Sequence, residues 1–516
     1  MSDPSPSTSE GGFHSVTEAR GLLERGEARS VELVEALLRR IGETDRAGPE
    51  LRSVLALCPD ALEVAHRMDQ ERRQGEIRGP LHGIPILVKD NIDTAGSEGT
   101  TAGSLALAMS RPTRDAVVVQ RLRAAGAIVI GKANLSEWAN FRGKRSSSGW
   151  SAAGGQCRNP HSLNRSPGGS SSGSGAGVAA GFAPLAVGTE TDGSILCPAA
   201  INGVVGIKPT VGLTSRTGVV PISSSQDTVG PMARSVADAA GLLSVLAGYG
   251  AGADPLDPMT MTRPEDLPAD YRAFCDFNGL SGARIGVPRQ HYFGYSAKAD
   301  ALAEAALAIA RKAGAVVVDP ADVTTAKSIS KGKDELTVLL HEYRAGLEAY
   351  LATRPAGEGQ PRTIQEVVAF NEAHATEELA FYGQEYLIAA AEVGDLDSPR
   401  YLKARARNWR KARREGIDAA LESAKADVLA FPTIGPAWCI DHVNGDPPAG
   451  VGYQVAAVAG YPAITVPVGK VSELPVGLCL VGTAWSEPTL IRIAFALEQR
   501  LALGDDLRPA WRWEIE

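Results

Sequence analysis

The chain has 516 residues, of which 44% are hydrophobic and 22% are charged, close to the averages of soluble globular proteins. Its 52 Lys and Arg residues and 60 Asp and Glu residues give a formal net charge of −8. This charge argues against a nucleic-acid partner and against an anionic membrane surface. The six cysteines show no metal-binding spacing, so we expect reduced thiols, no metal and a cytoplasmic protein.

The N-terminal region is predicted to consist of a polar tail and a group of helices. Residues 1–12 have neither the basic nor the apolar segment of a signal peptide, and we expect them to be disordered. Residues 13–75 are expected to form helices that pack on the main domain. Ser15 is expected to cap the first of them, which ends near Gly26, and Ser30 to cap the second. Residues 76–516 are predicted to form a single domain, because no linker divides them.

Strand and helix patterns alternate from residue 81 onward. The apolar run 84–88 predicts a strand, 115–125 a helix stopped by Gly126, and 127–130 the next strand. The same order recurs at 284–287, 299–313 and 316–318, and further strands are expected at 428–431, 464–468 and 477–481. This alternation predicts an α/β fold with a large mixed, mostly parallel sheet flanked by helices on both faces. Residues from about 334 to 422 are predicted to be a helical insertion, either a lid over the active site or a peripheral layer.

The residues that carry chemistry are one lysine and two serines. Lys89 follows the apolar run, and Ser170 and Ser194 lie in Gly- and Ser-containing segments without a histidine. A serine hydroxyl becomes a strong nucleophile only when a base removes its proton. A desolvated lysine can be that base, because burial favours its neutral form. The set therefore indicates acyl transfer by two serines and a lysine.

At these residues the chain resembles the amidase signature family. The resemblance covers residues 81–501, through the segments 83–91, 166–198 and 459–467. Within the family it is strongest to bacterial peptide amidases, through 134–143, 188–195 and 197–200.

The resemblance implies a role for each residue of the set. Lys89 would be the general base and Ser194 the nucleophile. Ser170, joined to Gly169 by a cis peptide bond, would relay protons between them. The resemblance also implies that no cofactor is needed and that backbone amides form an oxyanion hole. The residues that would supply these amides are Thr191, Asp192, Gly193 and Ser194.

The implied activity is hydrolysis of carboxamides with release of ammonia, above all from C-terminal peptide amides or N-acyl amino acid amides. The alternatives are a broad aliphatic or aryl amidase and a glutamine-dependent amidotransferase A-type subunit. Many family members carry an arginine where this chain has Leu196, and its absence favours a neutral or apolar acyl portion. The expected partner is a small-molecule or peptide amide substrate, without nucleic acid or membrane, and the expected assembly is a monomer or homodimer.

Two other interpretations start from the same Gly- and Ser-rich segment. Residues 169–173 fit a Gly-x-Ser-x-Gly nucleophile elbow with Ser171 as nucleophile, although no strand is predicted before them. The base of such an elbow would be one of His291, His341, His374 and His442. A phosphate-binding loop is the second interpretation, but the Gly-Lys-Ser/Thr ending is missing. The candidate pocket-lining residues are Trp138, Phe141, Trp150 and Cys197.

Overall fold

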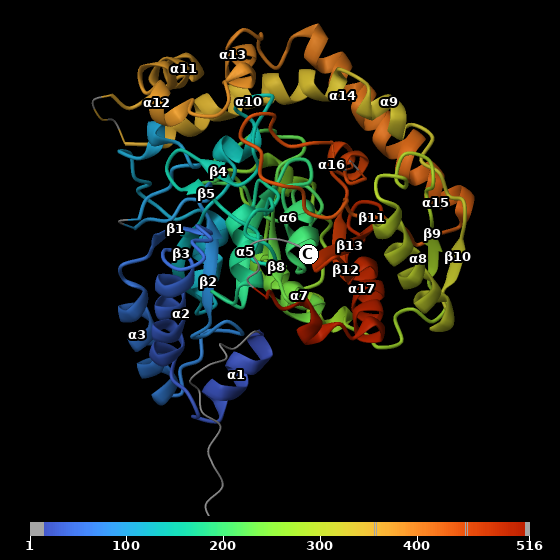
Figure 1. The fold of residues 1–516 in the computed structure, drawn as a ribbon, viewed down its shortest axis with the longest axis horizontal. Helices are drawn as coiled ribbons and strands as arrows, with labels where there is room; N and C mark the ends of the chain where they lie inside the picture. The colour runs from blue at the N-terminus through green and yellow to red at the C-terminus, as the bar shows by residue number, and fades with distance from the viewer. Residues whose placement is uncertain are drawn as a thin grey trace, which may run out of the picture.

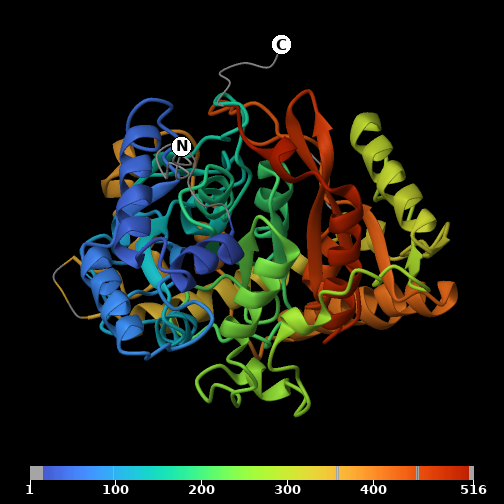
Figure 2. The ribbon, with the colours of Figure 1, turned by 90° about the horizontal axis from the view of Figure 1, so that it is seen from below.

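The computed structural model describes residues 15–510 except 97, 356, 358, 449 and 451. The predicted tail at 1–12 and the first two residues of the 13–75 region lie outside this part of the chain. In Figure 1 the sheet crosses the molecule, and Figures 1 and 2 both place the N-terminal helices and the α8–β10 unit at opposite ends of it.

One sheet of eleven strands organises the described residues. In order across the sheet, the strands are β1 (Val54–Leu57), β3 (Ile128–Ala133), β2 (Pro85–Lys89), β6 (Leu185–Glu190), β8 (Thr228–Ala233), β7 (Val205–Lys208), β12 (Ala463–Val471), β13 (Leu474–Val481), β11 (Val428–Pro432), β9 (Arg284–Gly286) and β10 (Val316–Val318). A separate two-stranded ribbon consists of β4 (Trp150–Ser151) and β5 (Gly155–Gln156).

The predicted large mixed sheet is confirmed, but parallel pairing is less extensive than expected. Parallel pairing joins β3, β2 and β6 near one end of the sheet and β11, β9 and β10 at the other end. All other neighbouring strands are antiparallel. One reason is the tight turn between β12 and β13, where Ser472 (φ 47°) and Glu473 (φ 68°) both have positive φ. A two-residue turn of this kind makes a hairpin, whose strands run antiparallel.

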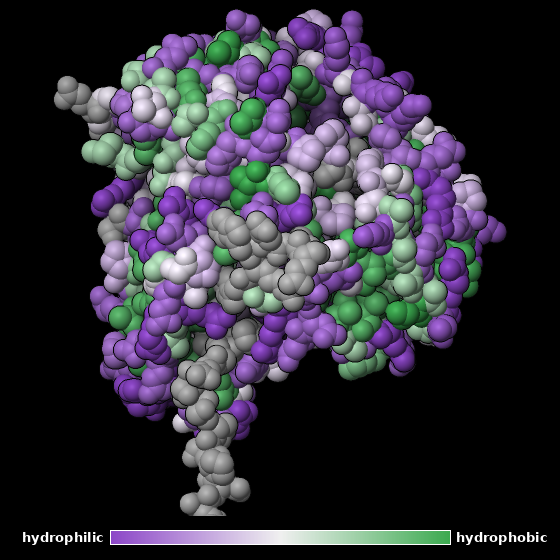
Figure 3. Space-filling model, in the orientation of Figure 1, coloured by the Kyte–Doolittle hydropathy of each residue, from purple (hydrophilic) through white to green (hydrophobic). Residues whose placement is uncertain are grey.

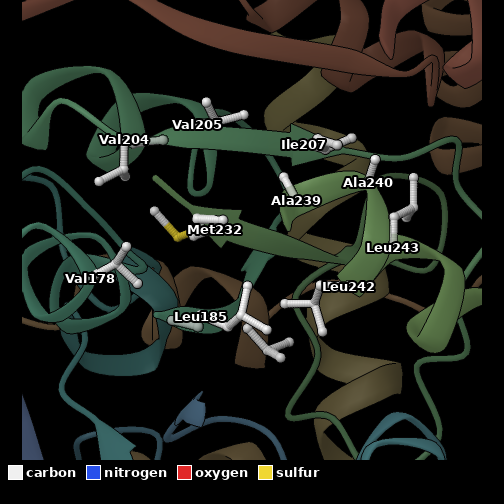
Figure 4. Close-up of a cluster of buried hydrophobic side chains, with 14 of the residues drawn as sticks. Val178, Leu185, Val204, Val205, Ile207, Met232, Ala239, Ala240, Leu242 and Leu243 are labelled. Atoms are coloured by element: carbon white, nitrogen blue, oxygen red, sulfur yellow. The ribbon is translucent and has the colours of Figure 1, made fainter. Parts of the chain in front are cut away.

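Helices cover both faces of the sheet, as predicted. Helices α5 (Ser172–Ala179) and α6 (Leu196–Asn202) pack on one face, and α7 (Val236–Ala247), α8 (Ala297–Lys312) and α17 (Glu487–Leu501) on the other. Figure 4 shows part of the buried apolar layer that holds them together. Its labelled members are Val178, Leu185, Val204, Val205, Ile207, Met232, Ala239, Ala240, Leu242 and Leu243. Removing such side chains from water is the main favourable contribution to the stability of the fold.

The N-terminal helices begin differently from one another. Ser15 Oγ accepts the Glu18 amide at 3.0 Å, so Ser15 caps α1 (Val16–Glu24) as predicted. The predicted cap at Ser30 is wrong, because Ser30 is the first residue of α2 (Ser30–Thr44). Its amide donates instead to Asp69 of α3 (Ala61–Arg73) at 2.6 Å. A carboxylate from a neighbouring helix therefore supplies the acceptor that the sequence pattern assigned to a serine hydroxyl.

The region predicted to be helical lies along one side of the molecule (Figure 1). It contains α10 (Asp334–Thr353), α11 (Ile364–Ala373), α12 (Ala375–Glu378), α13 (Glu385–Ala391), α14 (Pro399–Ala412) and α15 (Asp418–Ala424). The remaining α-helices of the described residues are α4 (Val117–Ala124), α9 (Ala326–Ser330) and α16 (Gln454–Ala459). None of the helices in the described part of the chain has the length and apolar character needed to cross a membrane, and the face drawn in Figure 3 is largely hydrophilic.

Candidate active site

Lys89 ends strand β2, and its side chain is completely buried (0% exposed). Its Nζ lies 2.8 Å from Ser170 Oγ, 2.8 Å from Thr189 Oγ1 and 3.3 Å from the Thr189 carbonyl oxygen. Burial holds the pKa of this amine well below its usual range, although the charges of Glu190 and Asp227 act in the opposite direction. The fold thus brings Lys89 and Ser170 into direct contact in a dry environment.

Thr189 sets the direction of the Lys89 amine. The Thr189 hydroxyl oxygen also accepts a hydrogen bond from Asn91 Nδ2 at 2.9 Å, so both of its lone pairs are occupied. A neutral amine has two N–H groups and one lone pair. If both N–H groups of Lys89 point to the oxygens of Thr189, the lone pair remains for the Ser170 hydroxyl. The sequence analysis missed Thr189, because the order of residues does not say which strand lies beside β2.

Ser170 lies in a segment with a well-anchored backbone. The Gly169–Ser170 peptide bond is cis, as the family resemblance implied. The Ser136 amide donates to the Ser170 carbonyl at 3.1 Å, and α5 begins two residues later. This segment is therefore not a free Gly- and Ser-rich loop.

The nucleophile elbow at Ser171 finds no support. Ser171 Oγ donates to the Thr189 carbonyl at 3.0 Å, and no histidine in the described part of the chain is hydrogen-bonded to it. The Ser171 amide donates to the Ser194 carbonyl at 3.1 Å. This residue therefore ties together the two segments that carry Ser170 and Ser194.

Ser194 lies in the loop between β6 and α6 and lines a cavity of about 510 Å³. Gly169, the neighbour of Ser170, lines the same cavity. The hydrogen bonds of the described residues do not include one between the Ser170 and Ser194 hydroxyls. The structure therefore brings Lys89 and Ser170 together and places Ser194 at the same cavity.

The loop before Ser194 presents unpaired backbone amides. Among the described residues, no acceptor is hydrogen-bonded to the amides of Thr191, Asp192 or Ser194, and all three residues line the cavity. Gly193 has a φ of 80°, and a Cβ at this position would lie 2.2 Å from Tyr453 Cε2. Only glycine fits this close approach and this left-handed backbone. The loop can therefore donate hydrogen bonds to a negatively charged oxygen inside the cavity.

Glu190 holds the other side of this loop. Its Oε2 accepts the amides of Ile195 at 2.7 Å and Leu196 at 2.9 Å. Burial raises the pKa of Glu190, while the charge of Lys208 and hydrogen bonds from these amides and from Gly193 lower it. The Gly193 amide is thus directed toward Glu190, so fewer than the four expected amides are free for a ligand.

The cavity wall comes from segments far apart in the sequence. Phe141 and Cys197 line it, as predicted. Trp138 and Trp150 do not belong to its lining: Trp138 packs in an apolar cluster, and the Trp150 ring meets the Tyr382 ring edge-on at 5.4 Å. In Figure 3 the surface is hollowed beneath the α10–α14 helices and beside α16. The lining residues that the sequence analysis missed include Glu335, Tyr386, Trp438, Asp446, Tyr453 and Gln454.

A larger cavity, of about 730 Å³, lies elsewhere on the molecule and contains none of the three candidate residues. Its lining includes Arg216, which forms an ion pair with Asp257 at 2.6 Å. We place the candidate active site in the smaller cavity, because Ser194 and Gly169, the neighbour of Ser170, line it. No three His, Cys, Asp or Glu side chains within the described residues gather closely enough to hold a metal ion.

Comparisons with known proteins identify the family of this chain. The sequence profile of the Amidase family matches residues 32–491. The crystal structure of the native peptide amidase from Stenotrophomonas maltophilia is similar with a TM-score of 0.90 and 51% identity, over 96% of this chain and 98% of that chain. A protein of Arabidopsis thaliana named probable amidase is 40% identical over 477 residues, which are 91% of this chain and 86% of that protein. The A-type subunit of the glutamyl-tRNA(Gln) amidotransferase of Anaeromyxobacter dehalogenans is 38% identical over 494 residues, 92% of this chain and 93% of that protein. The chain therefore belongs to the amidase signature family and is an amide hydrolase.

Proposed function

We propose that this amide hydrolase releases ammonia from C-terminal peptide amides or N-acyl amino acid amides by a Ser–Ser–Lys acyl-enzyme mechanism. The observation that carries the proposal is the 2.8 Å contact between Lys89 Nζ and Ser170 Oγ in a fully buried site beside the cavity that Ser194 lines. An exposed lysine would be protonated at neutral pH and unable to accept a proton, whereas a desolvated one is a competent base.

The proposed reaction runs through two acyl-transfer steps. Lys89 takes the proton of Ser170 while Ser170 takes that of Ser194, whose Oγ attacks the carboxamide carbon. The unpaired amides of the loop stabilise the oxyanion, and one such donor contributes about 3–4 kcal/mol. Ser170 then gives a proton to the departing ammonia and is reprotonated by Lys89. A water molecule loses its proton along the same relay and hydrolyses the acyl ester of Ser194, which regains its hydroxyl.

The size and the charge of the cavity favour a peptide amide over glutamine. A volume of about 510 Å³ lies within the usual range of small-molecule sites, about 300–1,000 Å³. The described lining residues include no Lys, Arg or His, and Leu196 is buried in an apolar cluster outside the lining. The α-carboxylate of glutamine would therefore meet no cation in this cavity. The 51% identity to a peptide amidase supports the same choice.

A substrate panel tests the proposal. The purified protein is incubated with an N-acetyl dipeptide amide, propionamide, acetanilide and L-glutamine, and ammonia or aniline is measured together with the acid product. We expect the dipeptide amide to give the highest kcat/KM, with one ammonia per free acid. Faster release from propionamide or acetanilide would indicate a broad amidase instead. Release from glutamine alone would indicate an amidotransferase subunit.

A further inference from the structure

The wall of the Ser194 cavity carries carboxyl groups without a basic side chain among its described lining residues. Asp192, Glu335 and Asp446 line it. Asp446 is satisfied locally, because its carboxyl group accepts Trp438 Nε1 at 2.8 Å and the Ser148 amide at 3.0 Å. Asp192 and Glu335 are the carboxyl groups that can respond to a ligand.

Glu335 projects from the first turn of α10 toward the loop of Ser194. Its two oxygens accept hydrogen bonds from Gln226 Nε2 at 3.1 Å and Gln454 Nε2 at 2.7 Å, which fix the carboxyl group without neutralising it. Asp192 lines the cavity beside Glu335, and its Oδ1 is buried with no partner among the described residues. Burial and the charge of Glu335 raise the pKa of Asp192 well above its usual value. Burial also raises the pKa of Glu335. Two buried carboxyl groups that face one cavity disfavour a second negative charge, so a cation placed between them would stabilise their ionised forms.

Aromatic side chains complete this environment. The lining of the same cavity includes Phe141, Tyr386, Trp438 and Tyr453, and aromatic faces attract cations.

Two exposed lysines, Lys331 and Lys333, lie on either side of the rim residue Gly332. Water and salt screen such exposed charges over about 8 Å, so they do not balance a buried carboxylate.

We infer that the cavity selects carboxamides whose acyl portion carries a positive charge, such as amides of lysine- or arginine-type residues, and that Glu335 is a specificity-determining residue. The inference rests on the proposed function and names its substrate class. The ammonium or guanidinium group lies against Glu335 and the unpaired Asp192 Oδ1 and supplies the positive charge that the described lining residues lack. The sequence analysis expected a neutral or apolar acyl portion, because Leu196 stands where many family members carry an arginine. The inferred positive charge replaces that expectation, since the Leu196 side chain does not line the cavity.

Two matched substrates test the inference. N-acetyl-L-lysinamide and N-acetyl-L-norleucinamide have side chains of nearly the same shape and differ in charge. We expect the wild-type kcat/KM for the lysinamide to be about tenfold higher, mainly through a lower KM, because the charge is present in both the bound substrate and the transition state. Glu335→Gln should lower the lysinamide-to-norleucinamide ratio about tenfold. Glu348→Gln, on the same helix but outside the cavity and paired with Arg344 at 3.8 Å, should keep the ratio.

The outcomes separate the inference from the proposed function. Hydrolysis of both amides with equal kcat/KM in the wild type overturns the inference and leaves the proposed function standing. Hydrolysis of neither amide by folded wild-type protein overturns both. A wild-type preference that Glu335→Gln does not change overturns the role of Glu335. If that variant fails to fold, the wild-type ratio alone decides the charge preference.

Discussion

Replacing Thr189 by valine tests whether the direction of the Lys89 amine matters. Valine keeps the branched shape and removes the hydroxyl oxygen that accepts from Lys89 Nζ at 2.8 Å and Asn91 Nδ2 at 2.9 Å. A buried donor left without a partner costs about 1–3 kcal/mol, so the free energy of unfolding should fall by that amount. Loss of the lone-pair alignment toward Ser170 should raise the activation barrier by about 1–2 kcal/mol, which lowers kcat/KM about 5- to 30-fold.

The assay measures ammonia release from an N-acyl amino acid amide across pH 6–9, together with urea unfolding. Thr189→Ser is the matched control, because it keeps the hydroxyl oxygen and should retain most of the activity. Wild-type kcat/KM in Thr189→Val, with an unchanged pH profile, would refute the argument that Thr189 orients the amine.

Variants at three further positions probe the proposed base and the proposed oxyanion loop. The pKa of Lys89 is lower in the folded state than in the unfolded state, so the folded state binds fewer protons between these two pKa values. The free energy of unfolding therefore rises with pH in this range, by up to about 1.4 kcal/mol per pH unit. Lys89→Met should abolish activity and flatten this rise in urea unfolding at pH 7–10; equal slopes would contradict a buried neutral amine. Gly193→Ala places a Cβ 2.2 Å from Tyr453 Cε2 and should lower kcat about 100-fold or more, so a wild-type kcat would mean that the loop is not the oxyanion site. Glu190→Gln keeps one oxygen acceptor for the loop amides and should retain more kcat/KM than Glu190→Ala; the reverse order would exclude a positioning role for this acceptor.

The sequence predicted most strands of the main sheet but missed β1, β7 and β8, and it placed the strand ends less well. The strand at 316–318 was placed correctly, and the helix predicted at 299–313 is observed at Ala297–Lys312. The strand predicted to end at residue 130 continues to Ala133, because Lys132 is buried and its Nζ donates to the Ile92 carbonyl at 2.8 Å. The strand before it likewise extends to Lys89. The two apolar runs stop before Gly131 and Lys89. Both strands continue beyond these points, because the buried amines of Lys132 and Lys89 find hydrogen-bond acceptors.

The contact between Lys89 and Ser170 was predictable, but the wall of the cavity was not. Lys89 and Ser170 were paired because their residue types suit one reaction, and they are in contact in the structure. Glu335 and Gln454 come from α10 and α16, and their positions depend on how these helices pack over the sheet. No local pattern indicates that position 335 meets position 192. The proposed preference for substrate charge could therefore be inferred only from the three-dimensional structure.

The most direct test of the account is to locate the covalent intermediate. Wild-type protein is incubated with a slowly hydrolysed N-acyl amino acid amide, quenched in acid and digested for mass spectrometry. We predict an acyl group on Ser194 that is absent from Ser194→Ala, which should also release no ammonia, whereas Ser171→Ala should be acylated like the wild type. Acylation of another residue, or unchanged ammonia release by Ser194→Ala, would contradict the mechanism.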